Sequence, residues 1–265
     1  MSDPAVTRRS AVRGGDRFDD AVVVEEPIEM RLGGVALAVV MRTPGHDDDL
    51  VRGFALTEGI ALRPAEIDHI DDLGDGRYEL VLAAGVIVDP ERFRRNLYAT
   101  SSCGVCGKAS IDAVRVAARR AAPGPSVGPA VLATCIEALE GAQPAFTLTG
   151  GLHAAGAFDA TGTLVTARED VGRHNAVDKV VGALAAEAWP IAPPILAVSG
   201  RVSFEIVQKA AVAGFRIVAG VSAVSSLAVD LAEELGLSLA GFTRDGGCTV
   251  YVDDGRLGGT PHTSG

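Results

Sequence analysis

The last third of the chain alternates short apolar segments with amphipathic ones, and this alternation restricts the possible folds more than any other feature. Apolar strands are predicted over residues 194–200, 215–222 and 237–242, and the helices between them end at Gly214 and Gly236. Strands and helices of these lengths predict right-handed crossovers and a parallel sheet with buried strands. We therefore expect an α/β fold in this part of the chain.

The first third has a different pattern. Residues 27–38 alternate apolar and polar side chains around Gly33-Gly34, which predicts a β-hairpin. Residues 47–60 place apolar side chains at helical spacing behind an acidic first turn, and residues 77–89 are typical of a strand. We expect a small α+β unit here.

The middle of the chain predicts two amphipathic helices. Ile111 and Val114 lie on one face of the first helix, and Leu132 and Cys135 lie on one face of the second. The segments 145–159 and 163–170 are expected to form a hairpin, and 248–252 a half-buried final strand with Cys248 facing valines.

Three parts are predicted in all. They are a flexible tail (residues 1–20), a small α+β domain (21–97) and a larger α/β domain (98–265). Arg8 and Arg9 are followed by more charge and glycine instead of an apolar segment, so they do not indicate a targeting signal.

Composition excludes several classes of function. The net charge of −10 argues against general nucleic-acid binding, and no apolar run approaches the roughly 20 residues that a membrane span needs. Four cysteines in 265 residues do not make a disulfide scaffold. A cytoplasmic protein fits these observations.

Ligands of open parallel sheets bind beyond the carboxyl ends of the strands. This rule selects three turns, at residues 199–201, 222–223 and 242–247, each with a hydroxyl and small residues. A single such turn is explained by capping, but three at one sheet edge favour a ligand site, with arginines suited to phosphate or a base.

Residues 168–179 concentrate charges of both signs before a helix, including Arg173 and His174. Helix capping explains part of this density, and a functional cluster is an equally good interpretation. His153 stands among small residues, and we interpret it as a histidine satisfied within the core.

Cys103 and Cys106 form a C-x-x-C motif, which zinc sites, dithiol redox enzymes and sulfur carriers all use. A structural zinc site needs four ligands. Cys135 and Cys248 are single cysteines on predicted core faces, so they do not supply the other two ligands, and zinc is disfavoured. A redox pair is expected directly after the first strand of a βαβ unit, which is not the position here. A nucleophilic thiolate would be favoured by Lys108 and by a helix beginning near it.

Taken in order, several segments resemble the formate dehydrogenase accessory sulfurtransferases, the FdhD family. The resemblance extends from about Pro27 to Val252. The segments that carry it are "TPGHDDDLVRGFALTEGI", "SSCGVCGK", "TGGLHAA", "REDVGRHNAVDKVVG", "SGRVSFEIVQKA" and "SLAVDLAEELGLSLAGFTRDG". Val224 departs from the family pattern, in which we expect proline.

The resemblance implies a cytidine-deaminase-like three-layer α/β/α domain and a homodimer. It implies that sulfur from a cysteine desulfurase is carried as a persulfide on Cys103, with Cys106 as the supporting thiol, to molybdenum bis-molybdopterin guanine dinucleotide before that cofactor enters formate dehydrogenase. The implied cofactor-binding loop is Phe242, Thr243, Arg244, Asp245, Gly246 and Gly247. No metal held by the protein itself is required, because the molybdenum belongs to the cofactor.

Two functional hypotheses remain at this stage. The first is a sulfurtransferase, and the second is a non-catalytic chaperone that binds the cofactor. Deamination is disfavoured, because Ala155 stands where the catalytic glutamate of H-x-E would be and Ser102 replaces the proline of P-C-x-x-C.

Overall fold

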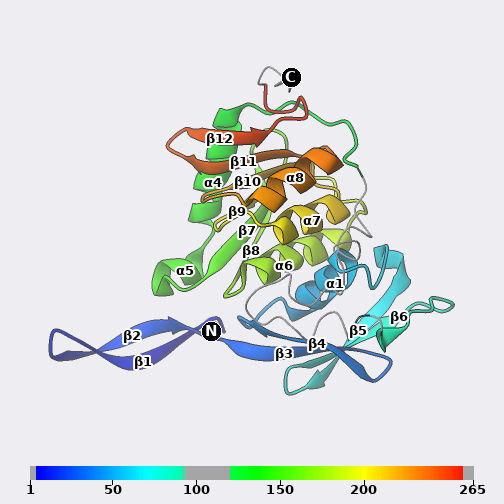
Figure 1. Cartoon of the computed structure of the whole chain (residues 1–265). Coiled ribbons are helices and arrows are strands. Elements are labelled where there is room, and N and C mark those ends of the chain that lie inside the picture. Colours follow the sequence, from blue (N-terminus) through cyan, green and yellow to red (C-terminus); the bar gives the residue numbers. More distant parts are fainter. Residues whose placement is uncertain (1–3, 92, 94–119, 259–265) are drawn as a thin grey trace.

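The structure is a computed structural model, and it describes residues 4–91, 93 and 120–258 (Figure 1). The chain forms three sheets with two, four and six strands in this described part. The six-stranded sheet belongs to the α/β unit, and the four-stranded sheet belongs to the smaller unit. The two-stranded sheet is a hairpin that projects from both (Figure 1).

The six-stranded sheet has the order β12-β11-β10-β9-β7-β8. Its strands are β7 (His153–Phe158), β8 (Leu164–Asp170), β9 (Ile195–Val198), β10 (Ile217–Gly220), β11 (Ser238–Arg244) and β12 (Gly247–Val252). Strands β9, β10 and β11 are parallel, as the alternating pattern predicts. Strand β7 and the edge strand β12 run antiparallel to β9 and β11, and the strands β9 and β10 are buried along their whole length.

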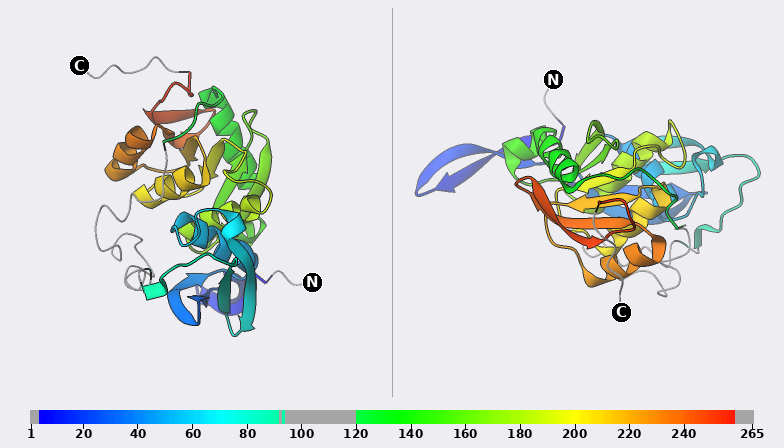
Figure 2. Two further views of the ribbon diagram at one scale, coloured as in Figure 1. Left: turned by 90° about the vertical axis from the view of Figure 1, so that its right-hand side faces the viewer. Right: turned by 90° about the horizontal axis from the view of Figure 1, so that it is seen from above.

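Helices cover both faces of this sheet. They are α4 (Pro129–Gly141), α6 (Arg173–Ala185), α7 (Phe204–Ala213) and α8 (Ser226–Leu235), with the short α5 (Pro144–Thr149) beside the sheet. One hydrophobic core joins α4 to one face, and a second joins α6, α7 and α8 to the other. Seen from above, α4 and α8 lie on opposite sides of the strands (Figure 2, right). The predicted α/β fold is confirmed, while its likeness to cytidine deaminases stays a prediction.

The smaller unit packs one helix on a four-stranded sheet of order β4-β3-β6-β5. Its elements are β3 (Glu26–Leu32), β4 (Val35–Arg42), α1 (Asp47–Thr57), the 3-10 turn η1 (Pro64–Glu66), β5 (Ile67–Gly74) and β6 (Arg77–Leu82). Gly33 and Gly34 both have positive φ, so the predicted hairpin forms around them. The strand predicted over 77–89 ends already at Leu82.

Helices α1 and α6 join the two units by a contact between backbones. A Cβ atom on Gly53 would lie 1.8 Å from the carbonyl oxygen of Asp178, and one on Gly182 would lie 1.9 Å from that of Asp49. No side chain other than hydrogen fits at either position, because backbone atoms cannot move aside as a flexible side chain can.

Buried ion pairs reinforce this junction. Lys209 of α7 lies 2.9 Å from Asp178 of α6 and 2.9 Å from Glu58, which follows α1. Lys179 lies 2.7 Å from Asp170 and donates a hydrogen bond to the carbonyl oxygen of Thr43 at 2.8 Å. Each buried cation therefore has a carboxylate partner, as a charge removed from water requires.

Residues expected to form a flexible tail contain two paired strands instead. Strand β1 (Val6–Arg13) pairs antiparallel with β2 (Asp16–Val23) through a turn at Gly14-Gly15, where both glycines have positive φ. The two glycines are a hairpin signal of the same kind as Gly33-Gly34. The base of this hairpin packs against α5 and the start of β7.

Three further expectations meet the structure differently. Residues 145–149, predicted as strand, lie in α5, and β7 begins only at His153. Cys248 was expected to share a face with the valines of its strand, but it is half-buried against the core of α4, whereas Val252 lies in the core on the other face of the sheet. The register shift beside Ala240 accounts for this difference. The helix predicted around Ile111 lies outside the described residues, as does the domain boundary at residues 97 and 98, so both stay predictions.

Candidate functional site

The ends of all six strands meet at one edge of the six-stranded sheet. Strands β9, β10 and β11 reach this edge with their carboxyl ends. Strand β7 runs the opposite way and begins here at His153, which is paired with Asp170 at the end of β8. The helices α6 and α7 begin in the turns that follow β8 and β9. Side chains from distant parts of the chain are thus brought together.

Backbone hydrogen bonds join the three predicted turns into one surface. The amide of Val202 donates to the carbonyl oxygen of Ala223, and the amide of Phe242 donates to that of Ser222, both at 3.0 Å. Val202 and Val224 also form a parallel bridge. Residues 199–202, 222–225 and 242–247 therefore form a continuous ledge, as the rule for parallel sheets predicts.

The segment 242–247 is a tight hairpin turn. Strand β11 continues to Arg244, which pairs with Gly247 at the start of β12. Asp245 and Gly246 form the two-residue connection, and both have positive φ, at 51° and 77°. An Asp-Gly pair favours such a turn. The side chains of Arg244 and Asp245 are exposed at its tip.

A β-bulge precedes this turn at Phe242 and Thr243, where the register against β12 shifts. Phe242 has a φ of 48°, a conformation that side chains larger than those of Asn and Asp seldom adopt, and 42% of the residue is exposed. Thr243 is fully buried, and its hydroxyl oxygen has no hydrogen-bond partner among the described residues. Strained residues in bulges occur often beside functional sites.

Four basic side chains gather at the other end of the ledge. We call His153, Arg173, His174 and Arg201 the basic corner. A Cβ atom on Gly200 would lie 3.2 Å from His153 Nδ1 and 3.7 Å from Arg173 Cδ, so the two side chains flank this glycine. Burial lowers the pKa of His153, and the charges of Arg173, His174 and Arg201 lower it further.

His174 has a carboxylate partner in the first turn of α7. Its Nε2 atom lies 2.7 Å from Glu205 and 3.4 Å from the hydroxyl oxygen of Ser203. Burial opposes ionisation of Glu205, but the hydrogen bond and charge of His174, together with the charge of Lys209, lower the pKa of Glu205. This pair fixes the histidine ring beside the ledge.

Most other charges in residues 168–179 join the two units instead of lining the ledge. Arg168 lies 2.9 Å from Asp49 of α1, and Asn175 donates to the carbonyl oxygen of Met41. Asp170, Asp178 and Lys179 belong to the buried ion pairs described above. A functional cluster was one interpretation of this segment, and the structure gives these five residues structural contacts. Arg173 and His174 remain at the site.

His153 differs from the expectation of a core histidine. It is half-buried at the first position of β7 and borders the ledge. Sequence reasoning also missed Arg201 as its neighbour. The signal that could have placed His153 at the ledge was topological. A strand that pairs antiparallel with β9 begins at the edge where β9 ends, and His153 is the first residue of such a strand.

Cys103 and Cys106 lie outside the described residues, so their assignment stays a prediction. The other two cysteines are placed. Cys135 is fully buried on α4, and burial raises its pKa to about 12. Burial also raises the pKa of the half-buried Cys248. Both thiols are therefore weak nucleophiles at neutral pH, since the thiolate is the reactive form.

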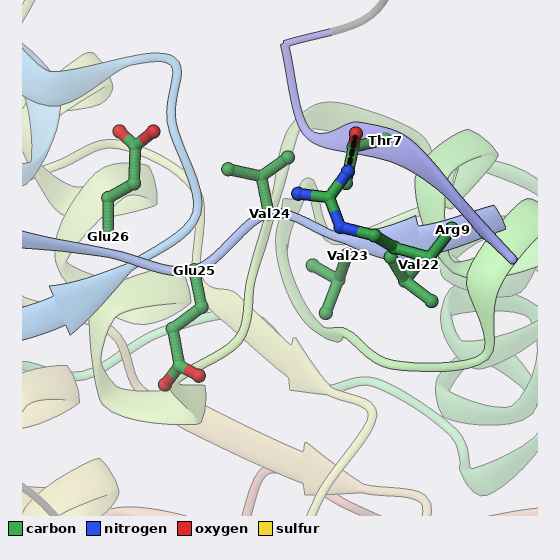
Figure 3. A pocket seen from close by; sticks show the side chains of 7 residues that line it. All are labelled: Thr7, Arg9, Val22, Val23, Val24, Glu25 and Glu26. Atoms are coloured by element: carbon green, nitrogen blue, oxygen red, sulfur yellow. Dashed lines mark hydrogen bonds between the residues drawn. The ribbon is translucent and has the colours of Figure 1, made fainter.

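A cavity of about 470 Å³ lies at the base of the β1–β2 hairpin (Figure 3). At one end, Arg9 donates a hydrogen bond to Thr7 at 3.0 Å, and at the other lie Glu25 and Glu26. Val22, Val23 and Val24 complete its lining. The described residues that line it include none of the predicted site residues.

Among the described residues, no helix has the length and apolar character of a membrane span. No group of three or more His, Cys, Asp and Glu side chains in the same part of the chain is arranged to hold a metal ion.

Comparison with known proteins gives consistent matches. The model of the FdhD/NarQ family matches residues 23–258. A sulfur carrier protein FdhD of Streptomyces avermitilis is 48% identical over 251 residues, covering 90% of this chain and 89% of the relative. The protein of the same name from Anaeromyxobacter sp. (strain K) is 47% identical over 272 residues, covering 96% of this chain and 94% of the relative.

A solved structure has the same fold. The crystal structure of a protein assigned as a formate dehydrogenase accessory protein, from Desulfotalea psychrophila, superposes with a TM-score of 0.74. The alignment covers 95% of this chain and 98% of that chain at 23% sequence identity.

Proposed function

We propose a function from one established premise: this chain belongs to the FdhD/NarQ family. Its relatives are named sulfur carrier proteins, and we infer that this chain also carries sulfur, in the service of a formate dehydrogenase. In this proposal Cys103 is the residue that holds the sulfur, and Cys106 is the supporting thiol. The ledge is the surface that binds the acceptor.

The sulfur-accepting step is a thiol–persulfide exchange. The Cys103 thiolate attacks the outer sulfur of a persulfide on a cysteine desulfurase, and the S–S bond of that persulfide breaks. The desulfurase cysteine leaves as a thiolate while the persulfide forms on Cys103, so the step needs no oxidant. The lower pKa of a persulfide keeps the transferred sulfur ionised and ready for delivery.

The proposed acceptor is molybdenum bis-molybdopterin guanine dinucleotide, bound as a substrate before it enters formate dehydrogenase. Its guanine-nucleotide end is assigned to Phe242, Thr243, Arg244, Asp245, Gly246 and Gly247. The exposed carboxylate of Asp245 can accept hydrogen bonds from the N–H groups of guanine, and Arg244 can contact phosphate.

One observation carries this proposal beyond family membership. Three turns that the sequence singles out are hydrogen-bonded into a single ledge, with a strained aromatic residue and exposed polar side chains at one end. We propose further that the α/β unit has a cytidine-deaminase-like fold. The helices that cover both faces of its sheet support this proposal. A cytoplasmic homodimer completes the proposal.

Mass spectrometry tests the sulfur-carrying residue. After incubation with a cysteine desulfurase and cysteine, the wild type should gain about 32 Da, the mass of one sulfur atom. Cys103→Ala should abolish this gain, while Cys248→Ala should retain it, because burial already disfavours the Cys248 thiolate. A full gain in the Cys103→Ala protein would refute the assignment.

The alternative is a chaperone that binds the cofactor without transferring sulfur. The two functions differ in the activity of the formate dehydrogenase matured in the same cells. Cys103→Ala should eliminate that activity if sulfur is transferred, while guanosine diphosphate binding to the purified protein persists. Activity at the wild-type level would favour the chaperone.

A further inference from the structure

We propose that the basic corner, centred on Arg173 and Arg201 with His153 beside them, binds the phosphate groups of a nucleoside diphosphate. The inference rests on the proposed function and deepens it, because it assigns the phosphates of the ligand to residues 41 positions or more before the 242–247 turn in the sequence. The turn would then receive the base, and the ledge between them would carry the sugar.

Arg173 has an unsatisfied hydrogen-bond donor at this position. Its Nε atom is buried and has no hydrogen-bond partner among the described residues. A buried donor without a partner costs free energy, and a guanidinium group donates most strongly to carboxylate or phosphate oxygens. The terminal nitrogens of Arg173 are not buried and donate no hydrogen bond to a described residue, so these are the atoms that can donate to the oxygens of a bound phosphate.

The positive charge of the corner is not cancelled by neighbouring carboxylates. Within the described ranges, neither Arg173 nor Arg201 forms an ion pair. The nearby Asp170 is held by Lys179 at 2.7 Å, and Glu205 is held by His174 at 2.7 Å. The corner therefore keeps two free guanidinium charges in a protein whose net charge is −10, which favours an anion.

Gly200 allows the corner to form. Because it has no Cβ atom, the ring of His153 and the side chain of Arg173 can both approach Gly200 at the place that a Cβ atom would occupy. Burial and the neighbouring positive charges lower the pKa of His153, which favours the neutral ring. A neutral imidazole has one N–H group, which can donate a hydrogen bond to a phosphate oxygen.

The corner and the turn are separated by a distance suited to one nucleotide. Strands β9, β10 and β11 are neighbours, and two strand spacings amount to about 10 Å. The hydrogen bonds of Ser222 and Ala223 make the ledge continuous across that gap. The first turn of α7, whose cap Ser203 makes no side-chain hydrogen bond to the helix, adds the positive end of a helix dipole.

Titration calorimetry with inorganic pyrophosphate, guanosine diphosphate and guanosine tests the assignment. The variants are Arg173→Gln and the exposed Arg201→Gln. The matched control is Arg63→Gln, which removes one surface charge near Trp189, beyond the far end of α6. We expect each corner variant to bind pyrophosphate and guanosine diphosphate about ten-fold more weakly, the effect of losing one charge-assisted hydrogen bond. Guanosine binding should not change, and the control should match the wild type.

Wild-type affinity for pyrophosphate in both corner variants would overturn the inference, and so would a wild type that does not bind pyrophosphate. Circular dichroism checks folding, and if Arg173→Gln does not fold, Arg201→Gln and Arg173→Lys decide. A wild type that binds pyrophosphate through the corner but does not bind guanosine would support the inference and remove guanine recognition from the proposed function. The two failures are thus distinguishable.

Discussion

At the scale of single residues, the interior of this protein holds two lysines whose ammonium groups are neutralised at close range. Burial by itself would lower the pKa of Lys209, but the carboxylates of Asp178 and Glu58 raise it above the ordinary value. Lys209 therefore stays charged throughout the working pH range. Its partners come from α6 and from the residue that follows α1, so the pair joins the two units.

Lys209→Met should destabilise the protein by about 3–5 kcal/mol, because it leaves carboxylates buried without their cation. Arg63→Gln is the comparison, since it removes an exposed pair with Glu66 and should cost at most about 1 kcal/mol. Urea unfolding measures both free energies. Equal losses would contradict the role assigned to Lys209.

His153 should make stability depend on pH. Its folded pKa is below its ordinary value because of burial and the charges of Arg173, His174 and Arg201, with Asp170 opposing them. The unfolded chain therefore binds the proton more readily, and stability falls as pH decreases below about 6.5. Urea unfolding of the His153→Gln variant should show a smaller loss over this range.

His69 should have the opposite effect on the pH dependence of stability. Its pKa is raised, chiefly by the hydrogen bond to Asp68, so its contribution is present at low pH and is lost as pH rises through the folded pKa. His69→Gln should steepen the acid loss that His153→Gln reduces. The same slope in both variants would contradict the assignment for His153.

Individual residues were the hardest to predict from the sequence. Residues 168–179 mix structural and site residues at adjacent positions, and composition cannot separate them. Asp178 and Lys179 are neighbours, yet one pairs with α7 and the other with β8. Their partners are fixed by tertiary packing, which local sequence does not encode.

At the scale of elements, the crossing of α1 and α6 depends on two glycines. Gly53→Ala should cost at least about 3 kcal/mol, because the new methyl group meets the backbone of α6. Gly141→Ala is the matched control. It also lies in a helix, but nothing lies within 4 Å of its added Cβ atom, so it should be neutral or stabilising by up to about 1 kcal/mol. Similar stabilities for the two variants would exclude a tight crossing.

The elements with a strong period were predicted well, and those without one were missed. Strands β9 and β10 are uniformly apolar, β11 is apolar over most of its first half, and the helices between them end at Gly214 and Gly236, as expected. The β1–β2 hairpin was missed because its strands are mostly polar on both faces. Helix α5 was missed because its six residues are too few to show a helical period.

At the scale of the whole molecule, the shared junction should make the two units unfold together. Trp189, the single tryptophan, contacts the core of the α/β unit and donates a hydrogen bond to Leu62 of the smaller unit at 3.2 Å. Its fluorescence and the far-UV circular dichroism should therefore report the same urea midpoint. Separate midpoints would mean that one unit survives without the other.

The position of the candidate site was largely predictable at this scale. The alternation of strands and helices predicts that β9, β10 and β11 are parallel, and their carboxyl ends then define the ledge. The basic corner was harder to predict from the sequence. His153 lies there only because β7 runs antiparallel to β9 and therefore begins at the edge where β9 ends. The role of Cys103 rests on sequence.

The backbone contact between Gly53 and Asp178 has a consequence for motion. Hinge bending between the units would first have to separate two helices that touch without intervening side chains, and would expose Lys209 and its carboxylates to water. The units should therefore turn over substrate as one rigid frame. Any reshaping during the proposed sulfur delivery has to come from segments attached to that frame, so a crosslink between the two helices should leave the proposed sulfur transfer intact.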